Sequence, residues 1–297
     1  MKNLLLAACL LPGTLLAREL PVIINDAGLI HNFEKKAGAL AESGDFPRVE
    51  SLKAELAKPK GMPPLPAVSA PEAPMDSVVM VGSVYDCGKC DRWHPGSLAT
   101  AWVVGADGLF CTNYHVIETL HGETAAISTR KGEVYPVLEI LLADKDHDVA
   151  IFRADITGLT PLPIAKDFAK VGADISCLSN PNQRFFYQSF GKVARYNTMR
   201  RKDRAMVPVM SITADFAKGS SGGPIINADN QVVGMVASTR SIYYENKTET
   251  GPTKLQMVMK SCVPGFVIED LLTTSKSPEG VDENADEKPS RELDPVS

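Results

Sequence analysis

Short runs of apolar residues, separated by Gly, Asp and Asn, fill the chain between residues 77 and 266. Runs rich in Val, Ile and Phe at this spacing, with turn residues between them, are typical of strands in an all-β sandwich or barrel. The segment INADNQVVG predicts a hairpin that turns at Asp229 and Asn230. The pattern therefore predicts an all-β domain over residues 77–272, closed by a short helix in VIEDLLT. The runs include SVVMVGSVY, ATAWVV, LFCTNYHV, YPVLEILLA, DVAIFRA, ISCLSNP, PVMSITA and QVVGMVAS.

The segments before and after this region have a different texture. Residues 18–60 contain apolar positions at helical spacing, in HNFEKKAGALAE and RVESLKAELAK, and predict two short helices in a helical N-terminal appendage or pro-segment. Residues 61–76 are rich in proline, which favours an extended, semi-rigid linker. Residues 273–297 are polar, acidic and without aromatic side chains, so they predict a disordered tail.

The first seventeen residues have the layout of a secretory signal peptide. Lys2 precedes an apolar run that ends in the small residue Ala17, and charged residues follow. Residues 1–17 therefore predict an exported protein, either periplasmic or secreted. Because the run is too short for a bilayer, no stable membrane span is expected. A lipid anchor at Cys9 is a minor alternative, since LAAC resembles a bacterial lipoprotein cleavage box.

Composition narrows the choice of partners. A net charge of −5 and a pI of about 5.6 give no general attraction to nucleic acid or to an anionic membrane surface. A hydrophobic fraction of 44% is enough for a substantial core. We therefore expect no nucleic-acid partner, and the sequence does not indicate an oligomeric state.

Five cysteines follow the signal peptide, and two of them, Cys87 and Cys90, form a CxxC with His94 close behind. This arrangement fits a short disulfide, half of a zinc site or a redox pair. Zinc normally takes four ligands and no second ligand pair is near, while a thioredoxin-like motif needs a βαβ context. A structural disulfide is the favoured interpretation, because disulfides persist in exported proteins.

Two polar residues at the ends of apolar runs suggest acid–base chemistry. His115, in CTNYHVIE, follows an apolar strand, and imidazole can take and return a proton near neutral pH. Asp148 directly precedes the apolar strand DVAIF, so its carboxylate can be held at the barrel edge to orient a histidine. Asp144 and Asp146 compete for this role, but only Asp148 continues directly into the strand.

The segment AKGSSGGPIIN is the most specific signal. Small residues around Ser221 let the backbone turn tightly while the hydroxyl stays exposed. The amides of Gly219 and Ser221 can then point at one oxygen, as in an oxyanion hole. A flexible turn is the alternative, but such turns rarely run straight into a buried strand such as PIIN.

TNYHV, DVAIF and GSSGGP, in this order, resemble the bacterial trypsin-like proteases of the chymotrypsin clan, including HtrA-like and glutamyl-endopeptidase-like branches. The resemblance covers residues 78–266. It implies two six-stranded antiparallel Greek-key barrels with the active site between them, a triad of His115, Asp148 and Ser221, and a polypeptide substrate. No metal or organic cofactor is implied, and no PDZ module is expected.

The resemblance also raises the question of specificity. Asp215 lies where trypsin-like enzymes place the base of the primary pocket, which would favour Lys or Arg substrates, and the opposite wall would come from Ala237, Ser238 and Thr239. The alternative is a structural aspartate that caps a turn. Ser220 replaces the aspartate that precedes the nucleophile in animal digestive relatives, so activation by a freed N-terminus is not implied.

Two other functions remain open from the sequence. A catalytically silent binding protein could keep the same scaffold, because a fold does not establish an activity. An esterase could use the same triad, since an oxyanion hole serves any acyl transfer.

Overall fold

The computed structural model of the chain describes residues 21–200, 206–245 and 251–274. The predicted signal peptide, Cys9 and the tail from residue 275 onward lie outside the described residues. Within the described ranges, no helix combines the length and the apolar character that a membrane crossing requires.

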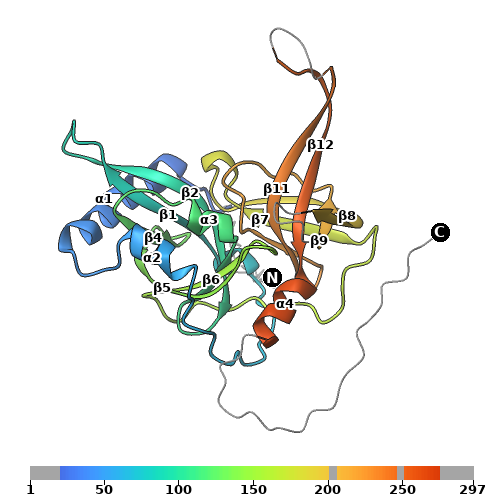
Figure 1. The fold of residues 1–297 in the computed structure, drawn as a ribbon, viewed down its shortest axis with the longest axis horizontal. Helices are drawn as coiled ribbons and strands as arrows, with labels where there is room; N and C mark the ends of the chain where they lie inside the picture. Colours follow the sequence, from blue (N-terminus) through green and yellow to red (C-terminus); the bar gives the residue numbers. More distant parts are fainter. Residues whose placement is uncertain (1–20, 201–205, 246–250, 275–297) are drawn as a thin grey trace, which may run out of the picture.

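The first barrel is a closed antiparallel sheet with the strand order β1-β2-β3-β6-β5-β4. In Figure 1 it occupies the green and teal half of the molecule. Closure is completed by β1, which pairs with β2 on one side and β4 on the other. The strands are β1 (Val78–Asp86), β2 (Trp93–Gly105), β3 (Leu109–Thr112), β4 (Thr124–Ser128), β5 (Val134–Asp144) and β6 (Val149–Ala154).

The second barrel has the order β10-β11-β12-β9-β8-β7 and is also closed. β10 and β11 form the hairpin predicted at Asp229 and Asn230, with Asn230 at a φ of 56°. The outer parts of β11 and β12 project from the barrel as a two-stranded arm (Figure 1). The strands are β7 (Asp174–Ser179), β8 (Tyr187–Arg200), β9 (Met206–Ile212), β10 (Pro224–Ile226), β11 (Val232–Glu245) and β12 (Thr253–Pro264).

Each barrel has its own apolar interior, and a third cluster joins the two barrels. Phe110 and Phe152 stack inside the first barrel with ring centroids 5.4 Å apart. Between the barrels, Trp102 of β2 is fully buried in the cluster that contains Leu178 and Met235 of the second barrel. The predicted closing helix is present as α4 (Gly265–Thr274) and packs on this cluster through Ile268. The predicted all-β, two-barrel fold class is confirmed.

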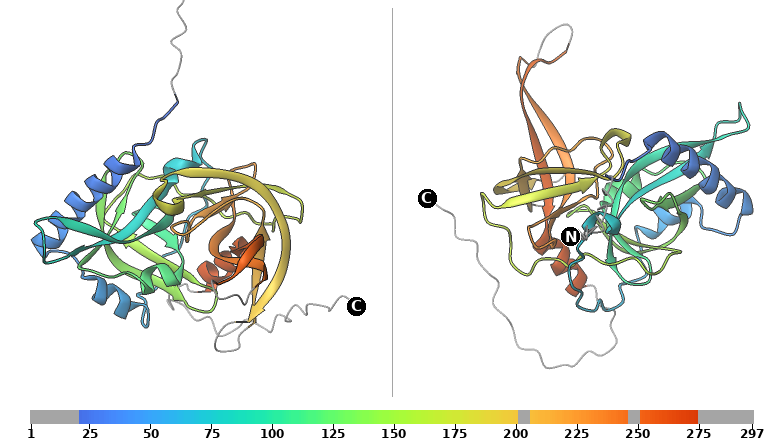
Figure 2. Two further views of the ribbon diagram at one scale, coloured as in Figure 1. Left: turned by 90° about the horizontal axis from the view of Figure 1, so that it is seen from above. Right: turned by 180° about the vertical axis from the view of Figure 1, so that it is seen from behind.

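The two helices expected before the domain are present as α1 (Asp26–Ser43) and α2 (Val49–Glu55). Figure 2 shows α1 lying along the outside of the first barrel. Phe33 of α1 is fully buried, in a cluster that includes Met80 of the first barrel and Phe185 and Phe186 of the second. The Phe185 amide also donates to the carboxylate of Asp26 at 2.9 Å. The helix therefore contacts both barrels.

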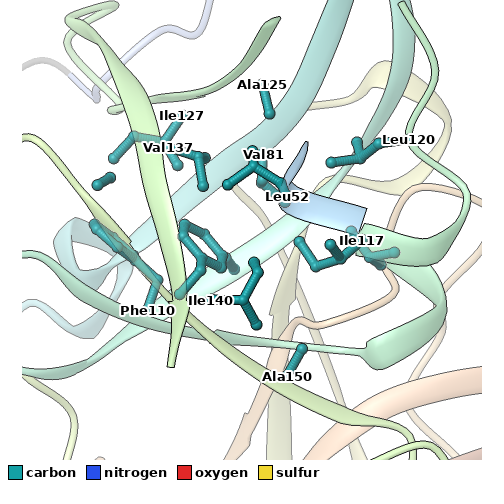
Figure 3. Close-up of a cluster of buried hydrophobic side chains, with 14 of the residues drawn as sticks. Leu52, Val81, Phe110, Ile117, Leu120, Ala125, Ile127, Val137, Ile140 and Ala150 are labelled. Atoms are coloured by element: carbon teal, nitrogen blue, oxygen red, sulfur yellow. The ribbon is translucent and has the colours of Figure 1, made fainter. Parts of the chain in front are cut away.

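The second helix contributes side chains to the interior of the first barrel. Val49, Leu52 and Leu56 are buried in the same cluster as Phe110 and Phe152. Figure 3 shows Leu52 among side chains of the barrel interior, including Val81, Ile117 and Leu120. The appendage expected from the sequence is thus part of the first barrel's core, although the domain boundary at residue 60 stays a prediction.

The proline-rich segment 61–76 lies against the barrels. Its start is fixed by the Gly61 amide, which donates to the Leu141 carbonyl at 3.0 Å. Met62 is 2% exposed, and the Pro71 carbonyl accepts from Asn230 Nδ2 at 3.0 Å. A short 3-10 helix, Pro74–Ser77, leads into β1.

We expect Leu52→Ala to lower the free energy of unfolding by about 2–5 kcal/mol, because it leaves a cavity in the first barrel. The exposed neighbour Ser51 provides the control, since Ser51→Ala should change stability by less than about 0.5 kcal/mol. Urea denaturation followed by tryptophan fluorescence measures both. Equal stability of the two variants would mean that α2 is not part of the cooperative core.

Candidate active site

His115 lies on the short helix α3 (Tyr114–Glu118), which begins just after β3 ends at Thr112. The sequence predicted this residue at the end of the strand itself. The chain instead leaves the barrel and turns into a helix, whose N-cap residue is Asn113. The imidazole is 39% exposed, so it stands at the rim of the first barrel, accessible to solvent.

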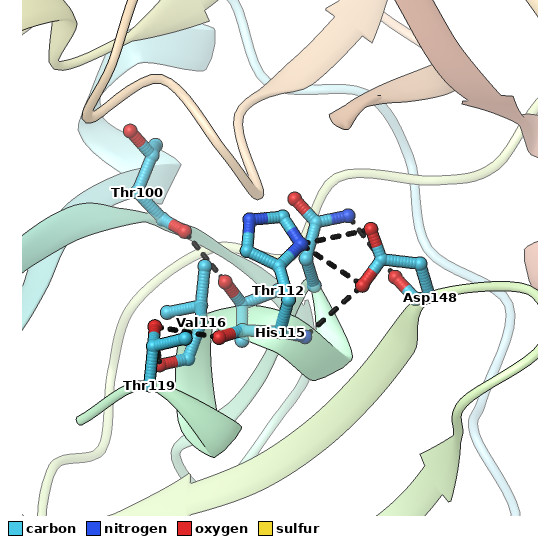
Figure 4. Close-up of polar contacts among 7 residues, drawn as sticks. Thr100, Thr112, His115, Val116, Thr119 and Asp148 are labelled. Atoms are coloured by element: carbon cyan, nitrogen blue, oxygen red, sulfur yellow. Dashed lines mark hydrogen bonds and ion pairs between the residues drawn. The ribbon is translucent and has the colours of Figure 1, made fainter. Parts of the chain in front are cut away.

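Asp148 holds His115 through both its backbone and its ring. The Nδ1 atom of His115 lies 2.9 Å from Oδ2 and 3.0 Å from Oδ1 of the carboxylate, and the His115 amide donates to Oδ1 at 3.0 Å (Figure 4). Because an ionised carboxylate only accepts hydrogen bonds, Nδ1 carries the proton in this arrangement. The other ring nitrogen, Nε2, is then available as an acceptor.

Asp148 itself is 8% exposed and has a φ of 60°, which is the left-handed region that non-glycine residues seldom adopt. Its carbonyl accepts from Nδ2 of the buried Asn113 at 3.0 Å. The competing Asp144 pairs with a different histidine, because its Oδ1 lies 3.2 Å from Nδ1 of His147. Uncommon backbone geometry of this kind clusters at functional sites.

Ser221 lies in the loop between β9 and β10, on the second barrel. Two glycines near it allow the path of this loop. Gly219 has a φ of 94° and Gly222 a φ of 85°. A Cβ at Gly222 would collide with the Thr100 carbonyl and with the Thr112 hydroxyl, so this position also requires a close backbone approach.

The adjacent Ser220 is fully buried, and its hydroxyl takes part in two hydrogen bonds. It accepts from the Ser179 hydroxyl at 3.0 Å and from the Ala217 amide at 3.3 Å. The Ser220 amide donates in turn to the Ala217 carbonyl at 2.9 Å. Neutral hydrogen bonds therefore order the loop at Ser220, the position at which animal digestive relatives have an aspartate.

Thr100, on β2 of the first barrel, connects the two barrels at the Ser221 loop. Its amide donates to the Ser221 carbonyl at 3.0 Å, and its hydroxyl donates to the Gly219 carbonyl at 2.9 Å. The same hydroxyl accepts from the Asn180 amide at 3.1 Å, while the Thr100 carbonyl accepts from Thr112 Oγ1 at 2.8 Å (Figure 4). One buried threonine thus fixes this loop relative to the strand that leads to His115.

A cavity of about 380 Å³ lies between the barrels and brings the candidate residues together. His115 lines it from the first barrel, and Gly219 and Ser221 line it from the second. Asn182 and Gln183, both with positive φ, complete that side of the cavity. Of the three predicted triad residues, only Asp148 does not line the cavity, and it contacts His115 instead.

The amides of Gly219 and Ser221 have no hydrogen-bond acceptor among the described residues. The preceding carbonyls are both engaged. The Lys218 carbonyl accepts from the Asn182 amide at 2.6 Å, and the Ser220 carbonyl accepts from the Gly223 amide at 2.9 Å. Since C=O and N–H point in opposite directions in a trans peptide, each free amide points away from these partners.

No hydrogen bond joins Ser221 to His115 within the described ranges, although both line the cavity. Hydrogen bonds between such groups are often long in the absence of substrate and shorten in the complex. The geometry thus provides a serine hydroxyl, an oriented imidazole and two free amides around one space.

The four residues predicted for the specificity pocket lie outside this cavity lining. The Asp215 side chain is 85% exposed, and its Oδ1 lies 2.5 Å from Nζ of Lys260, whose side chain is 14% exposed. Lys260 pairs in β-sheet register with Thr239, and Ser238 pairs with Ser261. Ala237 is partly buried against the cluster between the barrels. Asp215 therefore forms an ion pair with Lys260, a residue 45 positions further along the chain that the sequence did not indicate as its partner.

The five cysteines that follow residue 17 are free. Burial raises the pKa of Cys177 to about 11, and it also raises the pKa values of Cys111 and Cys262, so these three thiols stay protonated at neutral pH. The Sγ atoms of Cys87 and Cys90 are 3.4 Å apart, which is longer than a disulfide bond. The expected disulfide at this CxxC is not present.

The two closed six-stranded barrels, with a cavity between them, have the architecture of the trypsin-like fold. Residues 99–235, which contain His115, Asp148 and Ser221, match the model of the trypsin-like peptidase domain. This part of the chain is therefore similar to trypsin-like peptidase domains, and the resemblance expected from its three motifs is confirmed.

Known proteins agree with this assignment. The chain is 27% identical over 140 residues to a probable periplasmic serine endoprotease DegP-like of Halomonas elongata, an alignment that covers 47% of this chain and 29% of that protein. It is 29% identical over 177 residues to serine protease Rv3671c of Mycobacterium tuberculosis, covering 58% and 41%. The chain thus spans less than half the length of these curated relatives.

A solved structure supports the fold. The active form of the Rv3671c protease from M. tuberculosis superposes with a TM-score of 0.52 at 20% sequence identity, covering 77% of this chain and 97% of that chain. At this level of identity the similarity supports the two-barrel fold alone.

Thr100, Asn180 and Lys260 are the residues of this region that sequence reasoning missed. Thr100 gave one weak signal, because it is a polar residue inside the apolar run ATAWVV. Asn180 and Lys260 gave none, since their partners lie 80 and 45 residues away along the chain.

We expect Thr100→Val to lower the free energy of unfolding by about 1–3 kcal/mol, because the Gly219 carbonyl and the Asn180 amide would lose their shared partner in the interior. Thr100→Ser keeps the hydroxyl and should cost only about 0.8 kcal/mol for the lost methyl group. Denaturant unfolding compares the two variants. Equal losses in both would show that packing, and not the hydrogen bonds, stabilises this contact.

Proposed function

We propose that the protein is a serine endopeptidase in which Ser221 is the nucleophile, His115 the general base and Asp148 the residue that orients His115. One observation carries the proposal: a single cavity is lined by the histidine of one barrel and the serine of the other, next to two amides without acceptors. The match to the trypsin-like peptidase domain supports the same chemistry.

In the first half of the reaction, Ser221 Oγ attacks the scissile carbonyl carbon while Nε2 of His115 takes the hydroxyl proton. The Asp148 carboxylate keeps the Nδ1 proton in place and stabilises the imidazolium that forms. Collapse of the tetrahedral intermediate breaks the C–N bond, and His115 returns the proton to the leaving amine. Water then enters, His115 accepts its proton, and hydrolysis of the acyl-enzyme restores Ser221.

The amides of Gly219 and Ser221 are proposed to bind the negative oxygen of each tetrahedral intermediate. Donors that are already fixed before the reaction cost no reorganisation when charge develops, and loss of one such donor typically slows kcat by about 10²–10³-fold. The hydrogen bonds of the preceding carbonyls support this role, because the Asn182 amide fixes the Lys218 carbonyl and the Gly223 amide fixes the Ser220 carbonyl, and so both peptide groups are held.

We further propose that the loop needs no freed N-terminus for activation. The Ser220 hydroxyl is already satisfied by Ser179 and Ala217, and no buried charge at this position requires a cationic partner. The proposed triad can therefore be assembled as soon as the two barrels fold.

Export of the protein is part of the proposal. It rests on the leader-like residues 1–17 and on the name of the Halomonas elongata relative, which is described as periplasmic. We propose that the protein's substrates are polypeptides in the periplasm or outside the cell. The division of the chain at residues 17, 60, 76 and 272 is proposed on the same sequence evidence.

The contacts of Asp215 favour the structural alternative over a pocket for Lys or Arg. A carboxylate that is already paired with Lys260 offers little net charge to a second cation. We therefore propose that the enzyme does not depend on Asp215 for its primary specificity.

The variant Ser221→Ala tests the nucleophile. We expect it to abolish labelling by a fluorophosphonate probe and to lower kcat/KM for a casein-derived peptide on the order of 10⁴–10⁶-fold, because the covalent step is lost. The exposed Ser51→Ala is the matched control and should label like the unmodified chain. Labelling of a different serine would reject Ser221, whereas no labelling of any form would favour a silent binding protein.

Asp215→Asn tests the specificity. Because the exposed Asp215 carboxylate is already paired with Lys260, its removal should change the ratio of kcat/KM for Lys and Ala at the cleaved position by less than about fivefold. Profiling with a peptide library measures this ratio. A loss of activity confined to Lys and Arg substrates, on the order of 100-fold, would show that Asp215 binds the substrate cation after all. Parallel assays with a p-nitrophenyl ester separate peptidase from esterase activity.

A further inference from the structure

The turn between β1 and β2 carries two thiols and an imidazole that the proposed peptidase mechanism does not use. Cys87 follows β1 directly, Cys90 comes three residues later, and His94 is the second residue of β2. The two Sγ atoms are 3.4 Å apart, and Cys90 Sγ lies 3.2 Å from Nε2 of His94. All three atoms lie within 4.8 Å of one another, and no other cluster of this kind occurs in the described ranges.

These distances fit a metal ion better than a disulfide. In a tetrahedral site with Zn–S bonds of about 2.3 Å and Zn–N bonds of about 2.1 Å, the ligand atoms lie about 3.6–3.8 Å apart. The Cys87–Cys90 and Cys90–His94 separations are both within about 0.4 Å of this range. A disulfide would instead require the sulfurs to approach to about 2.05 Å.

The turn itself is built to hold the ligands. Asp86 Oδ1 accepts from the Gly88 amide at 2.8 Å, and Gly88 has a φ of 64°, so the chain turns tightly between the cysteines. The Lys89 backbone also hydrogen-bonds to the Cys87 sulfur, so the turn is ordered around this side chain.

The base of the turn is anchored to the rest of the molecule. His94 lies opposite Tyr85 in the β1–β2 register, with ring centroids 5.5 Å apart. Trp93 donates from Nε1 to Glu42 of α1 at 2.8 Å, and its ring leaves room only for a glycine at Gly38. The imidazole therefore starts from a fixed position, which lowers the entropy lost on metal binding.

We propose that Cys87, Cys90 and His94 bind one zinc ion, with a water molecule or an external donor in the fourth position. Two thiolates and an imidazole are the donor set of zinc and not of magnesium or calcium, which prefer oxygen. No fourth His, Cys, Asp or Glu of the described residues belongs to the cluster, and Cys90 is exposed. The ion would therefore be open to solvent on one side.

Metal binding at this site would affect the wall of the cavity between the barrels. Pro95, Gly96 and Ser97 directly follow His94 and line the cavity that contains His115 and Ser221. A zinc ion would hold the start of this wall segment to the end of β1. The binding itself does not depend on the proposed peptidase activity, so the two proposals can fail separately.

The test is metal binding by the purified chain, reduced with a phosphine and kept free of oxygen. Titration with Co²⁺ should saturate at one ion per chain and give the near-ultraviolet thiolate-to-cobalt band together with the visible bands of a tetrahedral site. Zn²⁺ should displace the cobalt and raise Tm. Absence of the thiolate band in the reduced chain would overturn the proposal.

Variants identify the ligands. Cys90→Ser and His94→Gln should each weaken zinc binding by more than about 100-fold, since loss even of a supporting residue typically costs 10–100-fold. Lys89→Ala, in the same turn, is the matched control and should bind like the unmodified chain, because only its backbone contacts sulfur. Unchanged affinity in Cys90→Ser or His94→Gln would assign the metal to another place and reject this site. The exposed position of the turn leaves folding intact, which circular dichroism of each variant verifies.

Discussion

The candidate site depends on one constraint: the two barrels must hold His115 and Ser221 at a fixed separation. Thr100 provides the direct connection: its amide and hydroxyl bind the carbonyls of Ser221 and Gly219, and its own carbonyl binds Thr112. Thr112 is the last residue of β3, just before the helix that carries His115. A displacement of either barrel would therefore strain this set of buried hydrogen bonds before it separated the serine from the histidine.

The backbone of the loop that carries Ser221 also helps to fix this separation. Gly219 and Gly222 have positive φ values that favour glycine, and Gly222 also lets the loop approach Thr100 without a collision. The neutral Ser220 hydroxyl accepts from the Ser179 hydroxyl at the end of β7 and from the Ala217 amide in the loop. The amides of Gly219 and Ser221 are free because the hydrogen bonds of the neighbouring carbonyls fix the orientation of each peptide group.

The sequence predicted features that depend on neighbouring residues and missed those that depend on distant ones. The strand pattern, the Asp229–Asn230 turn and the closing helix follow from local chemistry, and all three are present. The motif TNYHV does not reveal that His115 lies on a helix. The strand before it ends at the rim of the barrel, and the position of that rim is set by the other strands. The Asp215–Lys260 pair joins residues 45 apart in sequence. Side chains brought together across a barrel leave no signal in a local pattern.

The burial of α2 in the first barrel changes what a cut in the proline-rich segment would produce. Val49, Leu52 and Leu56 are held by the barrel interior, and α1 is held by Phe33 and by the Asp26 contact with the second barrel. A nick between residues 63 and 73 would therefore yield a two-chain protein with the N-terminal fragment still bound, and not a released domain. The packing of α1 and α2 on the barrels is therefore comparable to that of a separate subunit bound by non-covalent contacts.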